Sequence, residues 1–272
     1  SDLVGLGWTT QNATSHYGMF YSDSKLPHYN SSYTDKARAY AGGLGYLEYI
    51  GSLSVTSNDT SLGTVSGGYS GKSHGTITAM PADGANFIGW YHNGEFLSRS
   101  ENYDCYCGSD QPYYVEGRFT DEPAVKVNLK PGTSYGWQEA TITNPVQEYY
   151  MYQSENYGSY PTYSVMKVTV SGRNSYTFYI NSYAYGSYDY TIVSTLDATN
   201  YPETSSSAYA YANTSAFQKY PGTFSTNNWK TVTFNLPNEG EHHFYIVFRN
   251  SSYYSYNNDR GYVLLPGPVI VE

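Results

Sequence analysis

Apolar residues recur at every second position through much of the chain after residue 124. This pattern covers 166–170, 176–180, 232–236 and 244–248. Successive side chains of a strand point to opposite faces, so a period of two predicts strands that bury one face. We expect further strands at 125–129, 190–194 and 262–265. So many short strands within 124–272 predict a two-sheet sandwich of the jelly-roll type.

The preceding segment shows short apolar runs that are separated by strong turn signals. Strands are predicted at 63–66, 76–80, 87–91 and 113–119. Pro81-Ala82-Asp83-Gly84 and Asn93-Gly94 lie between them. Both favour tight turns because proline presets φ and glycine accepts positive φ. Asn93-Gly94 therefore predicts a β-hairpin.

The order of these strands and turns resembles the bacterial extracellular repeat known from internalins, the Listeria–Bacteroides or B-type repeat. The resemblance covers residues 62–119 and rests on Leu62–Gly68, Gly75–Gly84, Phe87–Tyr91, Asn93–Glu95 and Val115–Phe119. It implies a small β-grasp-like module that acts as a non-catalytic spacer or adhesive unit on secreted or surface-anchored proteins. The chain departs from the family pattern between Ser100 and Tyr113, where 102–108 replaces an alternating Thr/Val-rich strand.

Asp121-Glu122-Pro123 marks a boundary, since a residue before proline is restricted to extended conformations. Residues 1–61 are interpreted as an N-terminal β segment, 62–121 as the repeat module and 124–272 as the sandwich. Residues 165–265 also resemble β-sandwich modules of gut-bacterial secreted proteins and of phage tail or fibre proteins. This resemblance rests on several short segments: 166–168, 188–190, 194–198, 240–242 and 259–264.

The composition supports an all-β fold and excludes several functions. Tyrosine accounts for 35 of 272 residues, and no helical stripe with a period of 3.6 is present. Charged residues make up 14%, the net charge is −9 and no polybasic run occurs, which argues against nucleic-acid binding. No apolar run approaches the roughly 18 residues of a membrane span, so no membrane insertion is predicted. The start at Ser1 without a signal-like stretch is expected of a mature or trimmed product.

Candidate chemistry is sparse, and no cofactor or metal is predicted. Cys105 and Cys107 are the only cysteines; the pair is read as structural, with a local or intermolecular disulfide as the alternative. His242 and His243 are neighbours before a strand and should point to opposite faces, which argues against joint metal ligation. Asn58-Asp59-Thr60 and Asn257-Asn258-Asp259 offer oxygen ligands for Ca²⁺, but turn formation is the favoured reading.

An enzyme is the less favoured class. No Gly-x-Ser-x-Gly elbow is present, and paired carboxylates of a glycoside hydrolase remain the main catalytic rival. Their candidates are Glu48, Glu139, Glu148, Glu155, Asp189 and Asp197.

The tyrosine excess is the most informative feature. Tyrosines cluster at 149–152, 183–185, 188–190, 209–211 and 253–256. Pairs separated by one residue should share one strand face, and an exposed aromatic ladder suits protein partners, identical subunits or glycans. The alternative is that tyrosine replaces Leu and Val in the sandwich. The predicted ligand-binding residues are Trp137, Trp229, Tyr253, Tyr254 and Tyr256.

These features predict a non-catalytic extracellular protein on a bacterial surface or a virion that acts in adhesion or assembly. A carbohydrate-binding module and a self-assembling filament or fibre subunit are the alternatives.

Overall fold

The computed structural model describes residues 51–72, 74–106, 112–132, 135–155, 161–184, 188–203, 205–251 and 259–272. Contacts divide the chain into two compact units, one that ends at Thr120 and one that spans Asp121–Glu272. Strands make up 57% of the described residues, which contain one short helix, and this confirms the predicted all-β class. Most of the segment predicted as an N-terminal β segment, residues 1–50, lies outside the described residues.

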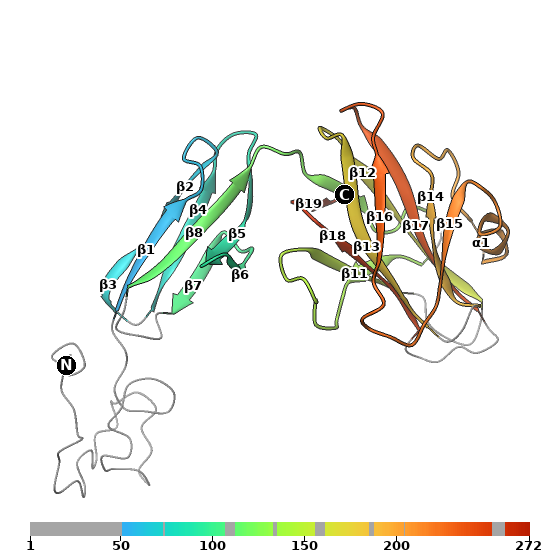
Figure 1. The fold of residues 1–272 in the computed structure, drawn as a ribbon, viewed down its shortest axis with the longest axis horizontal. Coiled ribbons are helices and arrows are strands. Elements are labelled where there is room, and N and C mark those ends of the chain that lie inside the picture. Colours follow the sequence, from blue (N-terminus) through green and yellow to red (C-terminus); the bar gives the residue numbers. More distant parts are fainter. Residues whose placement is uncertain are drawn as a thin grey trace, which may run out of the picture. The chain divides into compact units, whose positions relative to one another are not determined.

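The first unit contains two β-sheets (Figure 1). One sheet has the strand order β3-β1-β8-β5-β6 and the other has the order β2-β4-β7. Strands β1 and β8 are parallel, whereas the other neighbours are antiparallel. The strands are β1 (Gly51–Ser57), β2 (Gly63–Ser66), β3 (Tyr69–Lys72), β4 (His74–Pro81), β5 (Asn86–His92), β6 (Glu95–Ser98), β7 (Asn102–Tyr106) and β8 (Tyr113–Thr120).

Alternation along these strands forms the core of the first unit. Ile77 and Ala79 of β4 point inward, and Trp90 of β5 is completely buried. The indole Nε1 of Trp90 donates a hydrogen bond to the carbonyl of Ser100 over 3.0 Å, which satisfies its one polar atom. Gly117 of β8 leaves room for this ring, because a Cβ there would lie 3.0 Å from the Trp90 side chain.

The predicted hairpin at Asn93-Gly94 is confirmed. His92 of β5 pairs with Glu95 of β6, and the two residues between them have φ values of 49° and 84°. Positive φ at both central positions gives the twist that a two-residue hairpin needs. Two features were not anticipated: β7 forms within the segment that departs from the repeat pattern, and β1 lies before residue 62 but belongs to this unit's larger sheet.

The second unit also contains two sheets (Figure 1). Sheet one has the order β10-β11-β18-β13-β16, and sheet two has the order β15-β14-β17-β12-β9-β19. The elements are β9 (Val125–Asn128), β10 (Trp137–Glu139), β11 (Tyr150–Ser154), β12 (Thr162–Val170), β13 (Ser175–Tyr183), β14 (Tyr190–Ser194), α1 (Ser205–Tyr211), β15 (Phe217–Pro221), β16 (Lys230–Asn235), β17 (His242–Asn250), β18 (Arg260–Leu265) and β19 (Val269–Val271).

The predicted alternation holds in the core of the second unit. The alternate residues of β13 and β17 meet between the two sheets, where the rings of Phe178 and Phe244 stack with centroids 4.9 Å apart. The intervening residues of β17, Tyr245 and Val247, point away from this core. They pack in a separate cluster that includes Ala208 of α1, a helix that no sequence pattern predicted. Within the described part of the chain, no helix is long and apolar enough to cross a bilayer.

Candidate functional site

The outer face of sheet one, which faces away from the core, contains a groove. Residues of β18 alternate strictly: Val263 and Leu265 point into the core, whereas Tyr262 and Leu264 point outward. The groove encloses about 270 Å³, just below the roughly 300–1,000 Å³ of ordinary ligand pockets. We call this space the outer-face groove; its lining is Thr141, Ile142, Gln153, Tyr183, Thr226, Arg260 and Tyr262.

Strand register builds the floor of the outer-face groove. Tyr262 of β18 pairs with Gln153 of β11 on one side and with Asn181 of β13 on the other. Two positions along, Arg260 of β18 pairs with Tyr183 of β13. Paired residues point to the same face of a sheet. The floor therefore combines two phenol rings with two amides and a guanidinium group.

Two loops form the walls. On one side the backbone N–H of Ala140 donates to the carbonyl of Met151 over 3.0 Å, and the hydroxyl of Thr141 donates to Oε1 of Gln153 over 3.2 Å. On the other side the Nδ2 group of Asn181 donates to the carbonyls of Ser225 and Thr226 over 3.0 and 3.1 Å. Buried amides of the floor thus hold both walls in place.

Further aromatic rings surround the groove. Tyr149 and Tyr179 stack with their centroids 5.8 Å apart, and Tyr183 meets Phe224 edge to face at 5.6 Å. Phe224 is half exposed. Trp229 packs against the same outward-facing cluster, so this predicted ligand-binding residue lies beside the groove. Its Nε1 atom is shielded from solvent and has no hydrogen-bond partner among the described residues.

The polar groups of the groove suit a neutral or anionic polar ligand. Burial raises the pKa of the Tyr262 phenol, while the charge of Arg260 acts in the opposite direction. The phenol therefore stays protonated at neutral pH and can donate or accept a hydrogen bond. Arg260 and Gln153 add planar donors, so the groove can hydrogen-bond hydroxyl, amide or carboxylate groups beside a flat apolar ring.

The other predicted site residues are placed differently. Trp137 is 2% exposed and belongs to the core between the two sheets, so it forms no ligand surface. Its indole is large enough to fill the inter-sheet space at the start of β10, which explains its burial. Tyr253, Tyr254 and Tyr256 lie outside the described residues. Cys105 is buried in the core of the first unit, and Cys107 lies outside the described residues, so the disulfide stays a prediction.

Among the described residues, tyrosine pairs separated by one residue do not form the expected exposed ladders. Tyr188 is 55% exposed, but Tyr190 is 1% exposed and packs in the cluster that contains Tyr245, Val247 and Ala208 of α1. Tyr188 precedes β14 and therefore does not follow its alternation. Tyr209 and Tyr211 lie on α1 rather than on a strand, and Tyr211 packs against Phe217. Several tyrosines thus occupy the core positions that Leu or Val would fill elsewhere.

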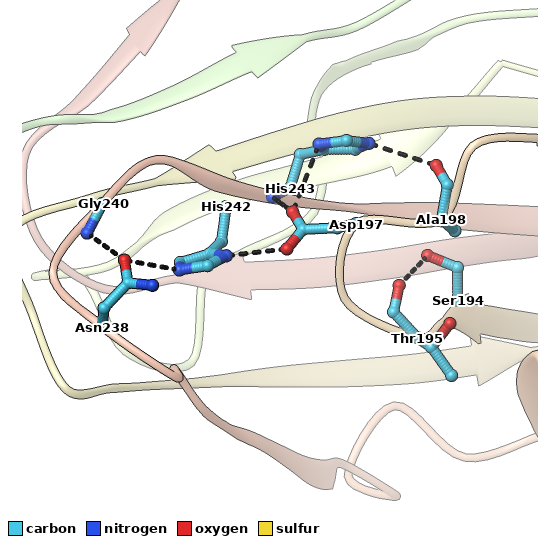
Figure 2. A network of polar contacts seen from close by, with 8 residues as sticks. All are labelled: Ser194, Thr195, Asp197, Ala198, Asn238, Gly240, His242 and His243. Carbon is cyan, nitrogen blue, oxygen red and sulfur yellow. Dashed lines mark hydrogen bonds and ion pairs between the residues drawn. The ribbon is translucent and has the colours of Figure 1, made fainter.

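A polar network joins the loop after β14 to the start of β17 (Figure 2). Nδ1 of His242 donates to Oδ2 of Asp197 over 2.7 Å, and the backbone N–H of His243 donates to Oδ1 over 3.0 Å. The ring of His243 also reaches this carboxylate, with its Nδ1 3.5 Å from Oδ1. The two rings were expected on opposite faces, which argued against joint metal ligation. Both rings nevertheless contact Asp197, which lies in the loop after β14.

This network has the acid–histidine part of a hydrolytic triad but no nucleophile among the described residues. The hydroxyl of Ser194 donates to the carbonyl of Thr195 over 2.8 Å and accepts the N–H of Tyr245, so it serves the backbone. On its far side, Nε2 of His242 contacts Oδ1 of Asn238 at 3.3 Å. Nor does any group of three or more His, Cys, Asp or Glu gather as a metal site within the described residues.

Comparisons with known proteins place the chain far from characterised ones. No protein-family model and no curated protein matches its sequence. Among solved structures it is similar to the secreted serine protease VesC from Vibrio cholerae, with 9% sequence identity and a TM-score of 0.30. The match covers 81% of this chain and 45% of that chain, so this chain spans less than half of the protease's length. A similarity this distant carries no conclusion about activity.

Proposed function

We propose that this chain is a non-catalytic extracellular adhesion module of a bacterium or bacteriophage, and that it binds its ligand in the outer-face groove. One observation carries the proposal: buried amides of the sheet fix both walls of an aromatic-floored groove. Gln153 holds the wall at Thr141, and Asn181 holds the wall at Thr226. A groove that is held open before the ligand arrives binds at a lower entropic cost than a flexible one.

A carbohydrate is the ligand class that this lining favours. Sugar rings present an apolar face to an aromatic ring and hydroxyl groups around their edge. Tyr183 and Tyr262 supply the rings, while Gln153 and Arg260 supply planar groups for hydroxyl pairs. The size of the groove, about 270 Å³, suits one or two sugar units rather than a folded protein surface.

A glycan array followed by calorimetry tests this proposal. We expect the Tyr183→Ala variant to lose at least tenfold in affinity for any sugar that the array identifies, because it removes half of the aromatic floor. Tyr209→Ala is the control, since Tyr209 is an exposed tyrosine of the same unit that lies on α1 and does not line the groove. Equal binding by both variants, or no binding of any glycan by the wild type, would refute a carbohydrate ligand at this groove.

Assembly into a filament or fibre is the second candidate, and the edge of sheet two favours it. Strand β19 pairs with β9 on one side and is the last strand of its sheet. Its Ile270 and Val271 side chains are both more than half exposed. Open apolar edges of this kind pair with strands of other chains. Light scattering of the wild type and of Ile270→Lys over a concentration series separates assembly from a monomeric adhesion module.

We also propose a specific fold for each of the two units. The first unit is a variant of the B-type repeat module, which the Asn93-Gly94 hairpin and the order of β4, β5 and β8 support. The second is a jelly-roll-type sandwich, supported by two facing antiparallel-rich sheets around one core. Both assignments are consistent with a surface-displayed protein.

A further inference from the structure

Four polar residues are buried at one end of the sandwich in the second unit. The chain crosses twice between its two sheets at this end, from β13 to β14 and from β17 to β18. Asp189 ends the first connection, Asn250 is the last residue of β17, and Ser251 and Asp259 begin and end the second connection. Asp189, Asn250 and Asp259 are each 0% exposed, and Ser251 is 4% exposed.

Backbone pairing brings these residues together from distant parts of the sequence. Tyr190 of β14 pairs with Arg249 of β17 in antiparallel register, which places the next residues, Asp189 and Asn250, side by side. The backbone N–H of Ser251 donates a hydrogen bond to Oδ1 of Asp189. A hydrogen bond connects the two sheets at this end: the hydroxyl of Ser182 in β13 donates to the hydroxyl of Thr191 in β14 over 2.7 Å.

The two carboxyl groups influence each other electrostatically. Burial and, to a smaller extent, the negative charge of Asp259 raise the pKa of Asp189 to about 6, against the hydrogen bonds from Ser251. A pair of buried carboxylates at neutral pH is costly unless a positive charge or several donors neutralise it.

Several polar atoms around these carboxylates lack partners. Among the described residues, nothing hydrogen-bonds Oδ2 of Asp189 or either polar atom of the Asn250 amide. Buried polar groups are nearly always satisfied in folded proteins, so a cluster of unsatisfied oxygens points to a bound species. Two of these three atoms are oxygens, and the Asp259 carboxyl group is buried as well.

Two nearby arginines hydrogen-bond backbone carbonyl groups. Arg249 donates from Nη1 to the carbonyl of Tyr188 over 2.8 Å and lies over the rings of Tyr190 and Tyr209. Arg260 donates from Nη1 to the backbone carbonyl of Asp259 over 3.0 Å. Asp189 forms no ion pair with any described residue, and the attraction of Arg249 is the weakest influence on its carboxyl group.

We propose that Asp189, Asn250, Ser251 and Asp259 form a Ca²⁺ site that joins the two crossing connections. Carboxylate, amide and hydroxyl oxygens are the hard ligands that Ca²⁺ takes, and it tolerates an irregular arrangement of six to eight of them. The sequence interpretation of Asp259 as a turn residue considered only its neighbours 257 and 258. The fold instead brings its charge within electrostatic range of Asp189, 70 positions earlier in the chain.

Calcium titration of the full chain tests the site. Protein stripped with EDTA is titrated with CaCl₂ by calorimetry, and its thermal unfolding is followed in parallel. We expect one saturable event and an unfolding temperature that rises with the logarithm of the CaCl₂ concentration above Kd. Tb³⁺ luminescence, sensitised by nearby tyrosines such as Tyr190 and displaced by CaCl₂, locates the ion independently of stability.

Asp189→Asn separates a cation site from a merely strained carboxylate pair. With a bound ion, the variant loses at least tenfold in Ca²⁺ affinity and becomes less stable than the wild type in CaCl₂. Without an ion, removing a buried charge raises its unfolding temperature at pH 8 with or without CaCl₂. Asp121→Asn, at an exposed position in the same unit, is the control. The second pattern, or a wild type that CaCl₂ neither binds nor stabilises, overturns the proposal.

Discussion

Asp197 and His242 are 45 positions apart, yet the carboxylate of Asp197 accepts a 2.7 Å hydrogen bond from the His242 ring. Asp197 has a φ of 55°, and its backbone N–H donates to the carbonyl of His243 over 2.7 Å. Backbone and side chain of one residue thus bind the start of β17 from the loop after β14 (Figure 2). This arrangement is a clamp between two strands of sheet two, and it makes stability depend on one carboxylate.

Asp197→Asn should destabilise the chain in a pH-dependent way. The hydrogen bond from His242 lowers the pKa of Asp197 below its ordinary value of 3.8. A carboxyl group with a depressed pKa stabilises the folded state above the ordinary pKa, and this contribution is lost as the pH falls through the lowered value. We expect a loss of about 1–2 kcal/mol at pH 7, since the carboxylate is half exposed and partly screened.

Urea denaturation from pH 7 down to pH 2.5 measures this effect. The difference between Asp197→Asn and the wild type should shrink below pH 4. Asp121→Asn serves as control because its carboxyl group is exposed, and it should follow the wild type throughout. A difference that stays constant over the whole pH range would show that the charge of Asp197 does not stabilise the clamp.

The hairpin between β5 and β6 provides a prediction for the first unit. Gly94→Ala places a Cβ at φ 84°, and a left-handed conformation costs a side-chain-bearing residue roughly 1–2 kcal/mol. Asn93→Gly relieves the same conformation at its neighbour, so it should change stability by less than about 0.5 kcal/mol. Hydrogen exchange of the β5 and β6 amides measures both variants. Equal protection in the two variants would contradict the assigned turn conformation.

The alternating strands could be predicted from sequence because the period of two follows from the backbone geometry of a single strand. Phe178, Ile180 and Phe244 point into the core where the pattern placed them. The same pattern did not predict which tyrosines are buried, because a phenol ring fits either a buried or an exposed position. Tyr190 is buried because β14 lies inside its sheet, which depends on neighbours far away in the sequence.

The candidate sites were harder to predict because they are assembled across strands. Gln153, Asn181 and Tyr262 lie in one row of the groove floor only through the register of three strands. Their spacing carries no local motif. Asp197 and His242 are 45 positions apart, and no local motif connects them.

Asn181→Ala should loosen one wall of the outer-face groove. Its Nδ2 group is the donor that holds the carbonyls of Ser225 and Thr226. Leaving such groups unsatisfied costs about 1–3 kcal/mol, so the amides of 223–229 should exchange faster. Hydrogen exchange read by mass spectrometry measures this, with Thr177→Ala as a control in the same strand, because its partner Thr233 lies outside the groove. Unchanged exchange of 223–229 would mean that other contacts hold the wall.

The two predicted tryptophans should respond in opposite ways to truncation. Trp137 fills the core, so Trp137→Ala should destabilise the chain by about 3–5 kcal/mol, the usual range for removing a buried aromatic ring. Trp137→Phe retains most of the apolar volume and removes an Nε1 atom that lacks a partner among the described residues, so its loss should be less than half as large. Trp229 is only partly buried beside the groove, so Trp229→Ala should cost less stability than Trp137→Ala. Urea denaturation of the three variants ranks the losses, and a Trp229→Ala loss equal to that of Trp137→Ala would place both rings in the core.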